Sequence, residues 1–371
     1  MPSTTHRILT TDARDLSALA DASVDQVVTS PPYPMIAMWD AIFAGLNADI
    51  GTSLHDLDGW RAFELMHVEL DRVWRECARV LRPGCFACVN IGDATRSIGD
   101  RFRLYPNHSR IISAFIALGF DTMPTILWRK QTNAPNKFMG SGMLPAGAYV
   151  TLEHEYILIF RKAGKRAFVS PSDKMRRNES AFFWEERNCW FSDVWDFKGA
   201  TQGLDARTRE RSGAFPFELP YRLVNMYSLK GDTVLDPFAG TGTTMHAAMA
   251  CGRNGLAVEI DAALAGHLRD ATAGVAERIN SRTERRLSDH RAFVATRSEG
   301  GKPPGYGSVH HGFPVMTRQE VEMRLEWVTS VARGESGEFV VEYEEVATES
   351  AGVPVAPRVV PTAGQQLSMG Q

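Results

Sequence analysis

Two hydrophobic periods alternate along the first half of the chain. Over residues 63–81 apolar side chains recur at intervals of three and four and stop before Pro83-Gly84, which predicts an amphipathic helix. Short apolar runs predict strands at residues 25–29, 86–91, 125–128 and 156–160, with a second helix at 111–118. Strands and helices that alternate in this way are typical of a largely parallel sheet covered on both faces.

The pattern returns late in the chain as a strand, helix, strand unit. A strand is predicted at residues 233–235, a helix that ends near Cys251, and a further strand at 256–260. The chain then becomes polar, with a small helix predicted at residues 318–331 and no internal repeat.

Two stretches, residues 129–150 and 163–215, lack long periodicity and are rich in Gly, Pro, Asn, Arg and aromatic residues. Such segments are typical of functional loops inserted on a rigid scaffold. We therefore expect a main domain over residues 1–283, a small extension of unknown role over 284–349, and a disordered tail over 350–371.

Composition adds three limits. No apolar run reaches the roughly 18 residues that a membrane span needs, and the polar N-terminus lacks a signal peptide's apolar core, so we expect a cytoplasmic protein. The five cysteines argue against a disulfide framework, and Cys85 and Cys88 fit a buried strand better than a metal or redox pair. The net charge of −3 hides a basic run over residues 161–177, which is either a nucleic-acid surface or a solvated charged face.

A glycine-rich turn follows the strand at 233–235. Gly240 and Gly242 allow a tight turn in which the backbone approaches a ligand, and Glu259 lies 19 residues after Gly240 at the end of the next strand. An acidic residue at about this distance accepts hydrogen bonds from ribose hydroxyls in nucleotide-binding units. Because a P-loop lysine and the full three-glycine dinucleotide spacing are absent, a nucleoside without pyrophosphate, such as S-adenosylmethionine, fits best.

The other motif is Thr-Ser-Pro-Pro-Tyr at residues 29–33, where two prolines end a strand in a rigid loop. An exocyclic amino nitrogen of a base is a poor nucleophile because its lone pair is delocalised into the ring. The Ser30 hydroxyl and the Pro31 carbonyl could accept its hydrogen bonds, and Tyr33 could stack on an extruded base. Alone the motif would be a surface turn; its place at the carboxyl end of a strand, in a sheet with a nucleoside-type site, favours catalysis.

Together these motifs resemble one known family. TSPPY at residues 29–33, FPFELPYRLV at 215–224 and DPFAGTGTT at 236–244 resemble the amino-group DNA methyltransferases of the beta arrangement, and the likeness spans roughly residues 6–275. The resemblance implies a Rossmann-like α/β fold dependent on S-adenosylmethionine. Its sheet would have seven mostly parallel strands, one of them antiparallel, in a circularly permuted motif order. It also implies double-stranded DNA as partner, with residues 163–215 as the target-recognition region.

The resemblance also implies roles for single residues. The catalytic set would be Ser30, Pro31, Pro32 and Tyr33. The cofactor set would be Asp12, Phe217, Asp236, Pro237, Phe238, Ala239, Gly240, Gly242, Thr243 and Glu259. Arg176, Arg177, Arg207, Arg209 and Arg211 could serve phosphates or guanine edges, or act only in solubility. The pair His154-Glu155 also looks like a recurring pair in this group, but a histidine before a strand is more often a structural hydrogen-bonding residue, so we do not include the pair in the catalytic set. No motif requires a metal.

Ser30 favours the cytosine-N4 branch, since Asp or Asn is usual at that position in adenine-N6 enzymes. A flipped cytosine would then attack the sulfonium methyl without a covalent enzyme intermediate. The adenine-N6 activity stays open, as do a nicotinamide-dependent dehydrogenase and a non-catalytic DNA-binding module. A dehydrogenase would leave Ser-Pro-Pro-Tyr without a function. The recognised DNA sequence, a cognate restriction endonuclease and the oligomeric state are not determined by the sequence.

Overall fold

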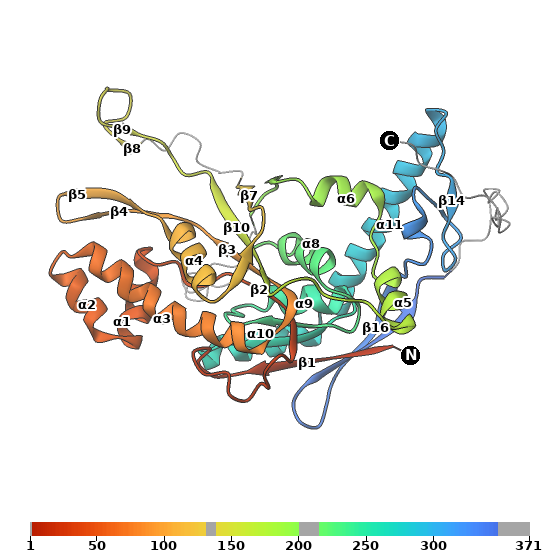
Figure 1. Cartoon of the computed structure of the whole chain (residues 1–371), viewed down its shortest axis with the longest axis horizontal. Coiled ribbons are helices and arrows are strands. Elements are labelled where there is room, and N and C mark those ends of the chain that lie inside the picture. Colours follow the sequence, from red (N-terminus) through yellow and green to blue (C-terminus); the bar gives the residue numbers. More distant parts are fainter. Residues whose placement is uncertain (1, 131–138, 200–214, 348–371) are drawn as a thin grey trace.

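The computed structural model describes residues 2–130, 139–199 and 215–347. Within these residues one sheet holds eleven strands, and helices lie on both of its faces (Figure 1). The strands follow the order β11 (Val194–Asp196), β7 (Ile126–Arg129), β10 (His154–Lys162), β3 (Leu81–Ile91), β2 (Val24–Thr29), β12 (Thr233–Asp236), β13 (Asn254–Val258), β1 (Ser3–Leu9), β17 (Phe339–Glu345) and β16 (Glu326–Arg333), and β6 (Phe120–Thr122) pairs with β10.

Seven of these strands form the expected central sheet. Strands β3, β2, β12, β13 and β1 run parallel to one another, and β10 runs antiparallel to both β3 and β7. The predicted α/β fold with a mostly parallel sheet is therefore confirmed. The predicted seven strands correspond to β7, β10, β3, β2, β12, β13 and β1, and the described sheet adds β6, β11, β16 and β17. The circularly permuted order remains a prediction.

Alternate residues of the central strands point into two separate cores. Val27 of β2 and Leu158 of β10 pack into one core, whereas their neighbours Val28 and Ile159 pack into the other. Because successive side chains of a strand face opposite sides, a strand buried on both faces is usually rich in apolar residues. This explains the apolar runs in the sequence, including the buried Cys85 and Cys88 of β3. The buried polar residues of β2, Asp25, Gln26 and Thr29, each form a side-chain hydrogen bond.

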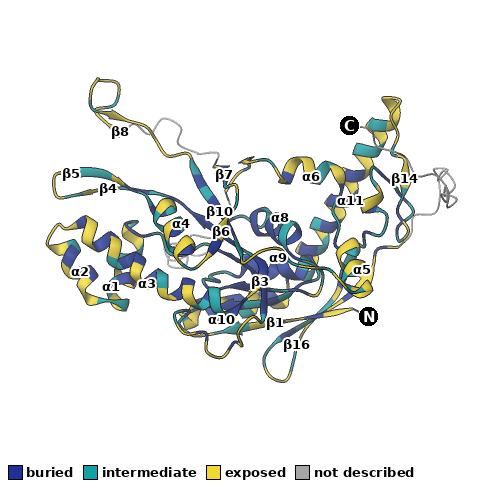
Figure 2. Ribbon diagram, in the orientation of Figure 1, coloured by how far each residue is buried: buried dark blue, intermediate teal, exposed yellow. Residues whose placement is uncertain are grey.

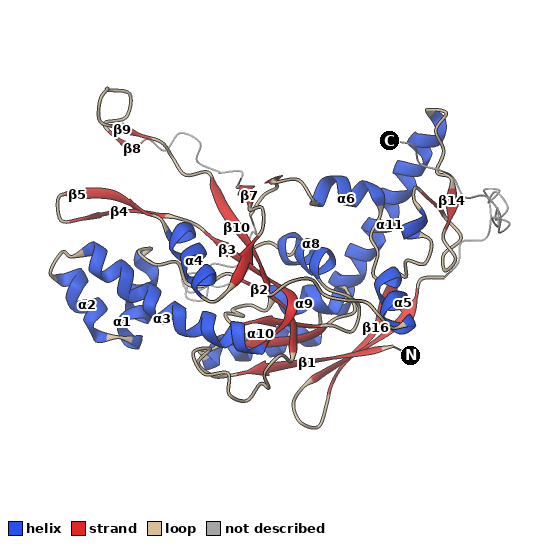
Figure 3. Cartoon of the chain, in the orientation of Figure 1, coloured by secondary structure: helices blue, strands red, loops and turns tan. Residues whose placement is uncertain are grey.

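Different helices cover the two faces of the sheet. Helices α3 (Gly59–Val80) and α4 (Asn107–Ala117) supply the first core, and α8 (Glu218–Tyr227) and α9 (Thr243–Ala250) supply the second. The apolar stripe of α3 makes it amphipathic, the Asp58 carboxylate caps its first turn through the N–H of Arg61, and the chain becomes extended at Leu81 before Pro83. Strands and covering helices are distinguished in Figure 3, and the buried residues follow the strands in Figure 2.

Further helices and two short strands complete the described fold. They are η1 (Ala37–Trp39), α1 (Asp40–Leu46), α2 (Ala48–His55), α5 (Pro171–Glu179), α6 (Trp184–Trp190), α10 (Ala262–Ala273), α11 (Ala276–Glu299), β14 (Tyr306–Gly307), β15 (Pro314–Val315) and η2 (Arg318–Glu320). Two hairpins, β4–β5 (Ala94–Ile98, Arg101–Tyr105) and β8–β9 (Met139–Gly140, Ala148–Tyr149), project beyond the sheet (Figure 1). Phe102 and Tyr149 stack across them with ring centroids 4.7 Å apart.

The predicted helix at residues 318–331 is wrong. Only Arg318–Glu320 is helical, and Glu326–Arg333 forms strand β16, which pairs with β17. Strand β17 in turn pairs antiparallel with β1. The β-branched residues Val328, Thr329 and Val331 suit a strand, and the free edge of β1 provides a partner that no local pattern reveals. The C-terminal segment thus extends the main sheet.

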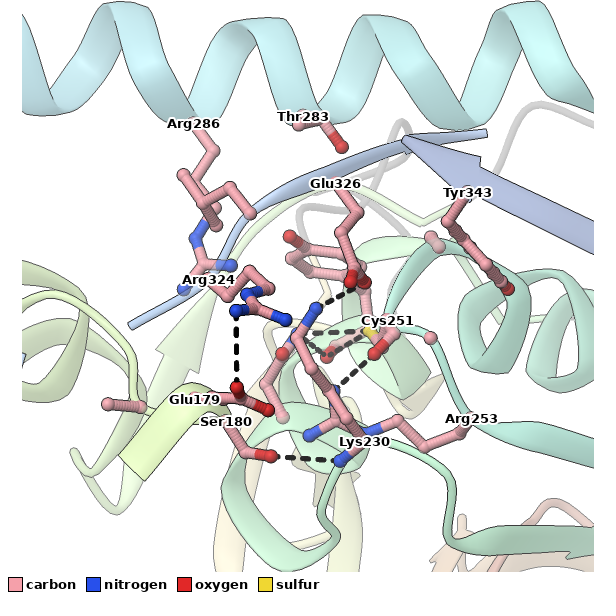
Figure 4. Close-up of a pocket in the computed structure, with 16 residues that line it drawn as sticks. Glu179, Ser180, Lys230, Cys251, Arg253, Thr283, Arg286, Arg324, Glu326 and Tyr343 are labelled. Atoms are coloured by element: carbon pink, nitrogen blue, oxygen red, sulfur yellow. Dashed lines mark hydrogen bonds and ion pairs between the residues drawn. The ribbon is translucent and has the colours of Figure 1, made fainter. Parts of the chain in front are cut away.

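A partly buried ionic junction connects this segment to the sheet (Figure 4). Lys230, which precedes β12, forms an ion pair with Glu326 of β16, and Arg324 lies 3.4 Å from the Glu179 carboxylate. Arg253 is 1% exposed and donates to the carbonyls of Ser228 and Cys251. The cavity between them has a volume of about 20 Å³, which suits about one water molecule. The junction therefore serves the packing of the C-terminal segment.

Candidate active site

The two sequence motifs meet at the carboxyl edge of the sheet. Strands β2 and β12 are parallel neighbours, so the residues that follow them emerge side by side. The Thr29 hydroxyl donates to the Asp236 carboxylate over 2.6 Å, and the Thr244 hydroxyl donates to the Val28 carbonyl over 3.3 Å. Residues that are 207 positions apart in the chain therefore belong to one site.

The glycine-rich turn is organised around the Glu259 carboxylate, which lies directly after β13 and is 8% exposed. One carboxylate oxygen accepts the N–H of Gly240 over 2.9 Å and the other accepts the N–H of Asp261 over 2.8 Å. Burial raises the pKa of Glu259, and these N–H donors oppose the shift. Each oxygen keeps a lone pair for a further donor, such as a ribose hydroxyl.

The two glycines of the turn have different surroundings. Both have positive φ, +52° at Gly240 and +79° at Gly242. A Cβ at Gly242 would lie 1.9 Å from Leu268 Cδ1, whereas a Cβ at Gly240 would have no neighbour within 4 Å. Gly242 is thus required by packing against α10, while Gly240 faces open space beside Glu259. This cradle fits a nucleoside held against the backbone.

Asp236 is the most strongly perturbed carboxyl group of this site. It is 3% exposed, and burial raises its pKa to about 6. Hydrogen bonds from the Thr29 hydroxyl and the N–H of Phe238 oppose the shift, and the charge of Glu259 adds to it. The carboxylate therefore carries an uncompensated charge at neutral pH, which a bound cationic group would stabilise.

The catalytic loop is fixed by a polar network behind it. The Ser30 hydroxyl donates to the Tyr33 hydroxyl over 3.1 Å, and the Tyr33 hydroxyl donates to the Glu155 carboxylate over 2.9 Å. The Asn90 side-chain N–H₂ donates to Tyr33 over 2.8 Å and to Glu155 over 2.7 Å. Burial and the Glu155 charge raise the pKa of Tyr33 well above its ordinary value, so Tyr33 keeps its proton.

Sequence reasoning missed three members of this network: Asn90, Glu155 and Lys130, whose ammonium forms an ion pair with Glu155. Asn90 is a polar residue at the end of a predicted strand, and this position could have marked it as a candidate site residue. Glu155 belongs to the pair left out of the catalytic set with His154, whose ring packs edge-on against Tyr156 at 4.9 Å. The role of Glu155 depends on the antiparallel pairing of β10 with β3, which the local sequence does not reveal.

Asp12 and Phe217 are less closely tied to the site. Asp12 follows β1, and its carboxylate accepts three N–H groups of Arg14. Partial burial by itself would raise the pKa of Asp12, but the hydrogen bonds and the charge of Arg14 outweigh this effect, and the pKa is lowered. Phe217 precedes α8 and stacks on Tyr221 at 5.7 Å, in the core beneath that helix. Their roles in cofactor binding remain predictions.

The basic run at residues 161–177 lies near the opposite edge of the sheet. Arg166 forms two hydrogen bonds with Asp232, just before β12, and lies 3.9 Å from Asp25 at the start of β2. DNA at the carboxyl edge would have to pass around the sheet to reach this run. Target recognition by residues 163–215 remains a prediction, and the first residues of this segment lie far from the carboxyl edge where the target base would bind. Arg207, Arg209 and Arg211 lie outside the described residues.

Comparison with known proteins agrees with this geometry. Residues 24–266, more than half of the chain, match the N6_N4_Mtase family, described as DNA methylase. The chain belongs to this family of amino-group DNA methyltransferases. It is 50% identical over 346 residues to the type II methyltransferase M.MthZI of Methanothermobacter thermautotrophicus, covering 92% of this chain and 96% of the relative. It is 49% identical to M.MjaI of Methanocaldococcus jannaschii, covering 70% and 89%.

A solved structure supports the cofactor. TTHA0409 of Thermus thermophilus, crystallised with S-adenosyl-L-methionine, is 34% identical to this chain with a TM-score of 0.56, covering 74% of this chain and 96% of that one. The enzyme is therefore S-adenosylmethionine-dependent, which removes the nicotinamide alternative. Among the described residues no cluster of three or more His, Cys, Asp or Glu could hold a metal ion, and no helix there is long and apolar enough to cross a membrane.

The first prediction tests the cofactor cradle through Gly240→Val. The new side chain would enter the open space beside Glu259, so we expect S-adenosylhomocysteine affinity to fall at least about tenfold, which corresponds to about 1.4 kcal/mol. Isothermal titration calorimetry measures this, with circular dichroism to confirm the fold. Gly242→Ala is the contrasting variant: its clash with Leu268 should lower the melting temperature as well. Normal binding by folded Gly240→Val protein would show that the cofactor lies elsewhere.

The second prediction concerns Asp236 and pH. A carboxyl group whose folded pKa is raised to about 6 binds protons more readily in the folded than in the unfolded protein. Lowering the pH from 8 to 5 should therefore stabilise the wild-type ligand-free protein relative to Asp236→Asn by on the order of 1 kcal/mol. Urea unfolding at both pH values measures the difference. An unchanged difference between the two proteins would mean that Asp236 is not perturbed.

Proposed function

We propose that this enzyme methylates the N4 amino group of cytosine in double-stranded DNA, with the target base turned out of the helix. The observation that carries the proposal is the Ser30 hydroxyl, which stands at the carboxyl end of β2 beside the cofactor turn and has its hydrogen directed at Tyr33. Its lone pairs are left to accept a hydrogen bond from an amino group. A neutral acceptor suits an amino group that needs orientation rather than full proton removal before attack.

The residues divide the work between binding and orientation. Glu259, Gly240 and Asp236 would hold the cofactor, which when bound supplies an electrophilic methyl group. Ser30 and the Pro31 carbonyl would accept the two amino hydrogens and so direct the nitrogen lone pair toward the methyl carbon. The proline pair fixes both acceptors because neither residue can change φ freely.

Tyr33 would serve the captured base by stacking. Its hydroxyl is fully engaged by Ser30, Asn90 and Glu155, so the side chain cannot swing to another rotamer without breaking three hydrogen bonds. A Cβ at Gly92 would lie 3.0 Å from Tyr33 Cε2, which explains glycine behind the ring. A ring held in this way offers a rigid face, and stacking is worth about 1–3 kcal/mol per base.

The relatives' names suggest a biological setting. Both M.MthZI and M.MjaI are named type II methyltransferases, and the first matches nearly the whole of this chain. We propose that this enzyme likewise protects a short DNA site as the modification part of a restriction-modification pair, with an endonuclease that acts independently.

The third prediction identifies the methylated base. Plasmid DNA incubated with the enzyme and S-adenosylmethionine should, after digestion to nucleosides and mass analysis, contain N4-methyldeoxycytidine. Because the family covers both amino bases, N6-methyldeoxyadenosine instead would replace the cytosine assignment with the adenine one. If neither methylated nucleoside were formed, the result would contradict catalysis and would favour a non-catalytic DNA-binding module. Ser30→Ala protein is the control and should lose most of the activity.

A further inference from the structure

The Glu155 carboxylate, beside the catalytic loop, contacts three side chains through its two oxygens. It is 8% exposed, at the start of β10, between the loop that carries Tyr33 and the end of β3 that carries Asn90. One oxygen accepts from Tyr33 and Asn90, and the other contacts Lys130. The Lys130 ammonium also lies 4.9 Å from the centroid of the Trp128 ring, which limits its movement.

This arrangement fixes the direction of each hydrogen bond. A carboxylate can only accept, so the Tyr33 hydroxyl must give its single hydrogen to Glu155. The Tyr33 oxygen then acts as acceptor toward its other partners, the Asn90 N–H₂ and the Ser30 hydroxyl. The single Ser30 hydrogen is therefore committed to Tyr33. The contact from Asn90 to Ser30 is 3.5 Å, too long to compete with its two shorter bonds.

Asn90 has no freedom to reverse this order. Its amide is 2% exposed, and turning it over would place its oxygen against the Glu155 carboxylate, with two acceptors facing each other. In the observed orientation its Oδ1 is buried without a hydrogen-bond partner, a cost that the bonds of its N–H₂ group must offset.

We propose that Glu155 is a positioning residue that makes Ser30 an obligate hydrogen-bond acceptor for the target amino group. A serine hydroxyl by itself can donate or accept, and a donor facing an amino group would repel it. Through Tyr33, the charge of Glu155 removes this ambiguity and also polarises the chain of bonds, which strengthens Ser30 as an acceptor. The inference rests on the proposed amino methylation and adds a residue that acts without touching the base.

Glu155→Gln is the test substitution because it preserves shape but adds a donor. The amide can donate to Tyr33, which frees the Tyr33 hydrogen to point at Ser30 and the Ser30 hydrogen to point at the substrate. We expect kcat to fall at least about tenfold, with KM for S-adenosylmethionine unchanged. Glu155→Asp keeps an acceptor-only group and should restore part of the loss. Glu153→Gln, the same change in an exposed ion pair with Arg129, is the matched control and should behave as wild type.

A double-mutant cycle separates this role from a structural one. If Glu155 acts through Ser30, the Ser30→Ala, Glu155→Gln double variant should be no slower than Ser30→Ala alone. The same lack of additivity should appear in equilibrium binding to a duplex that carries the target base opposite an abasic site. This second readout reports base capture without turnover, once the recognised site is known from sequencing of methylated plasmid.

The outcomes distinguish the inference from the function on which it rests. Wild-type enzyme that forms no methylated amino base would overturn the proposed function. Active wild-type enzyme whose Glu155→Gln variant keeps kcat within about twofold would overturn only the positioning role. Additive losses in the double variant would do the same, because they would show an effect of Glu155 independent of Ser30. Unfolding midpoints of all variants within a few degrees of wild type ensure that the comparison concerns catalysis.

Discussion

The parallel pairing of β2 with β12, closed by the hydrogen bond from Thr29 to Asp236, is the contact on which the site depends. It brings together a catalytic loop near the start of the chain and a cofactor turn more than 200 residues later. The bond also connects their chemistry, because the buried Asp236 carboxylate has its pKa raised to about 6 and Thr29 is one of the groups that limit this rise. Neither motif would define a site without the neighbouring strand.

Much of the fold could be predicted because central strands carry a strong signal. Strands buried on both faces carry apolar runs, so the sequence predicts β2, β10, β12 and β13 within about two residues of their observed bounds, and it predicts the second half of β3, which begins five residues earlier, at Leu81. The edge strands lack this signal. The helix predicted in place of β16 is wrong because a strand exposed on one face has few residues to define its period, and its pairing through β17 to β1 depends on contacts more than 300 residues apart.

The site shows the same division between local and distant signals. Ser30, Tyr33, Gly240 and Glu259 belong to contiguous motifs with readable chemistry, and the structure brings their loops to one edge of the sheet. Asn90 and Glu155 have no motif of that strength. Their importance comes from cross-strand pairing of β10 with β3, which places two buried polar side chains behind the catalytic loop. The basic run in the sequence likewise did not indicate where DNA would bind, because its Arg166 pairs with Asp232 near the amino ends of the strands.

A structure of the enzyme with S-adenosylhomocysteine and a duplex bearing its recognition site tests the central claim most directly. The account predicts that the target base has left the helix, that its amino group donates to the Ser30 hydroxyl, and that the cofactor sulfur lies beyond the amino nitrogen, between Ser30 and the Gly240 turn. A target base still stacked in the duplex, or a cofactor sulfur turned away from Ser30, would contradict the joining of the two loops into one methyl-transfer site.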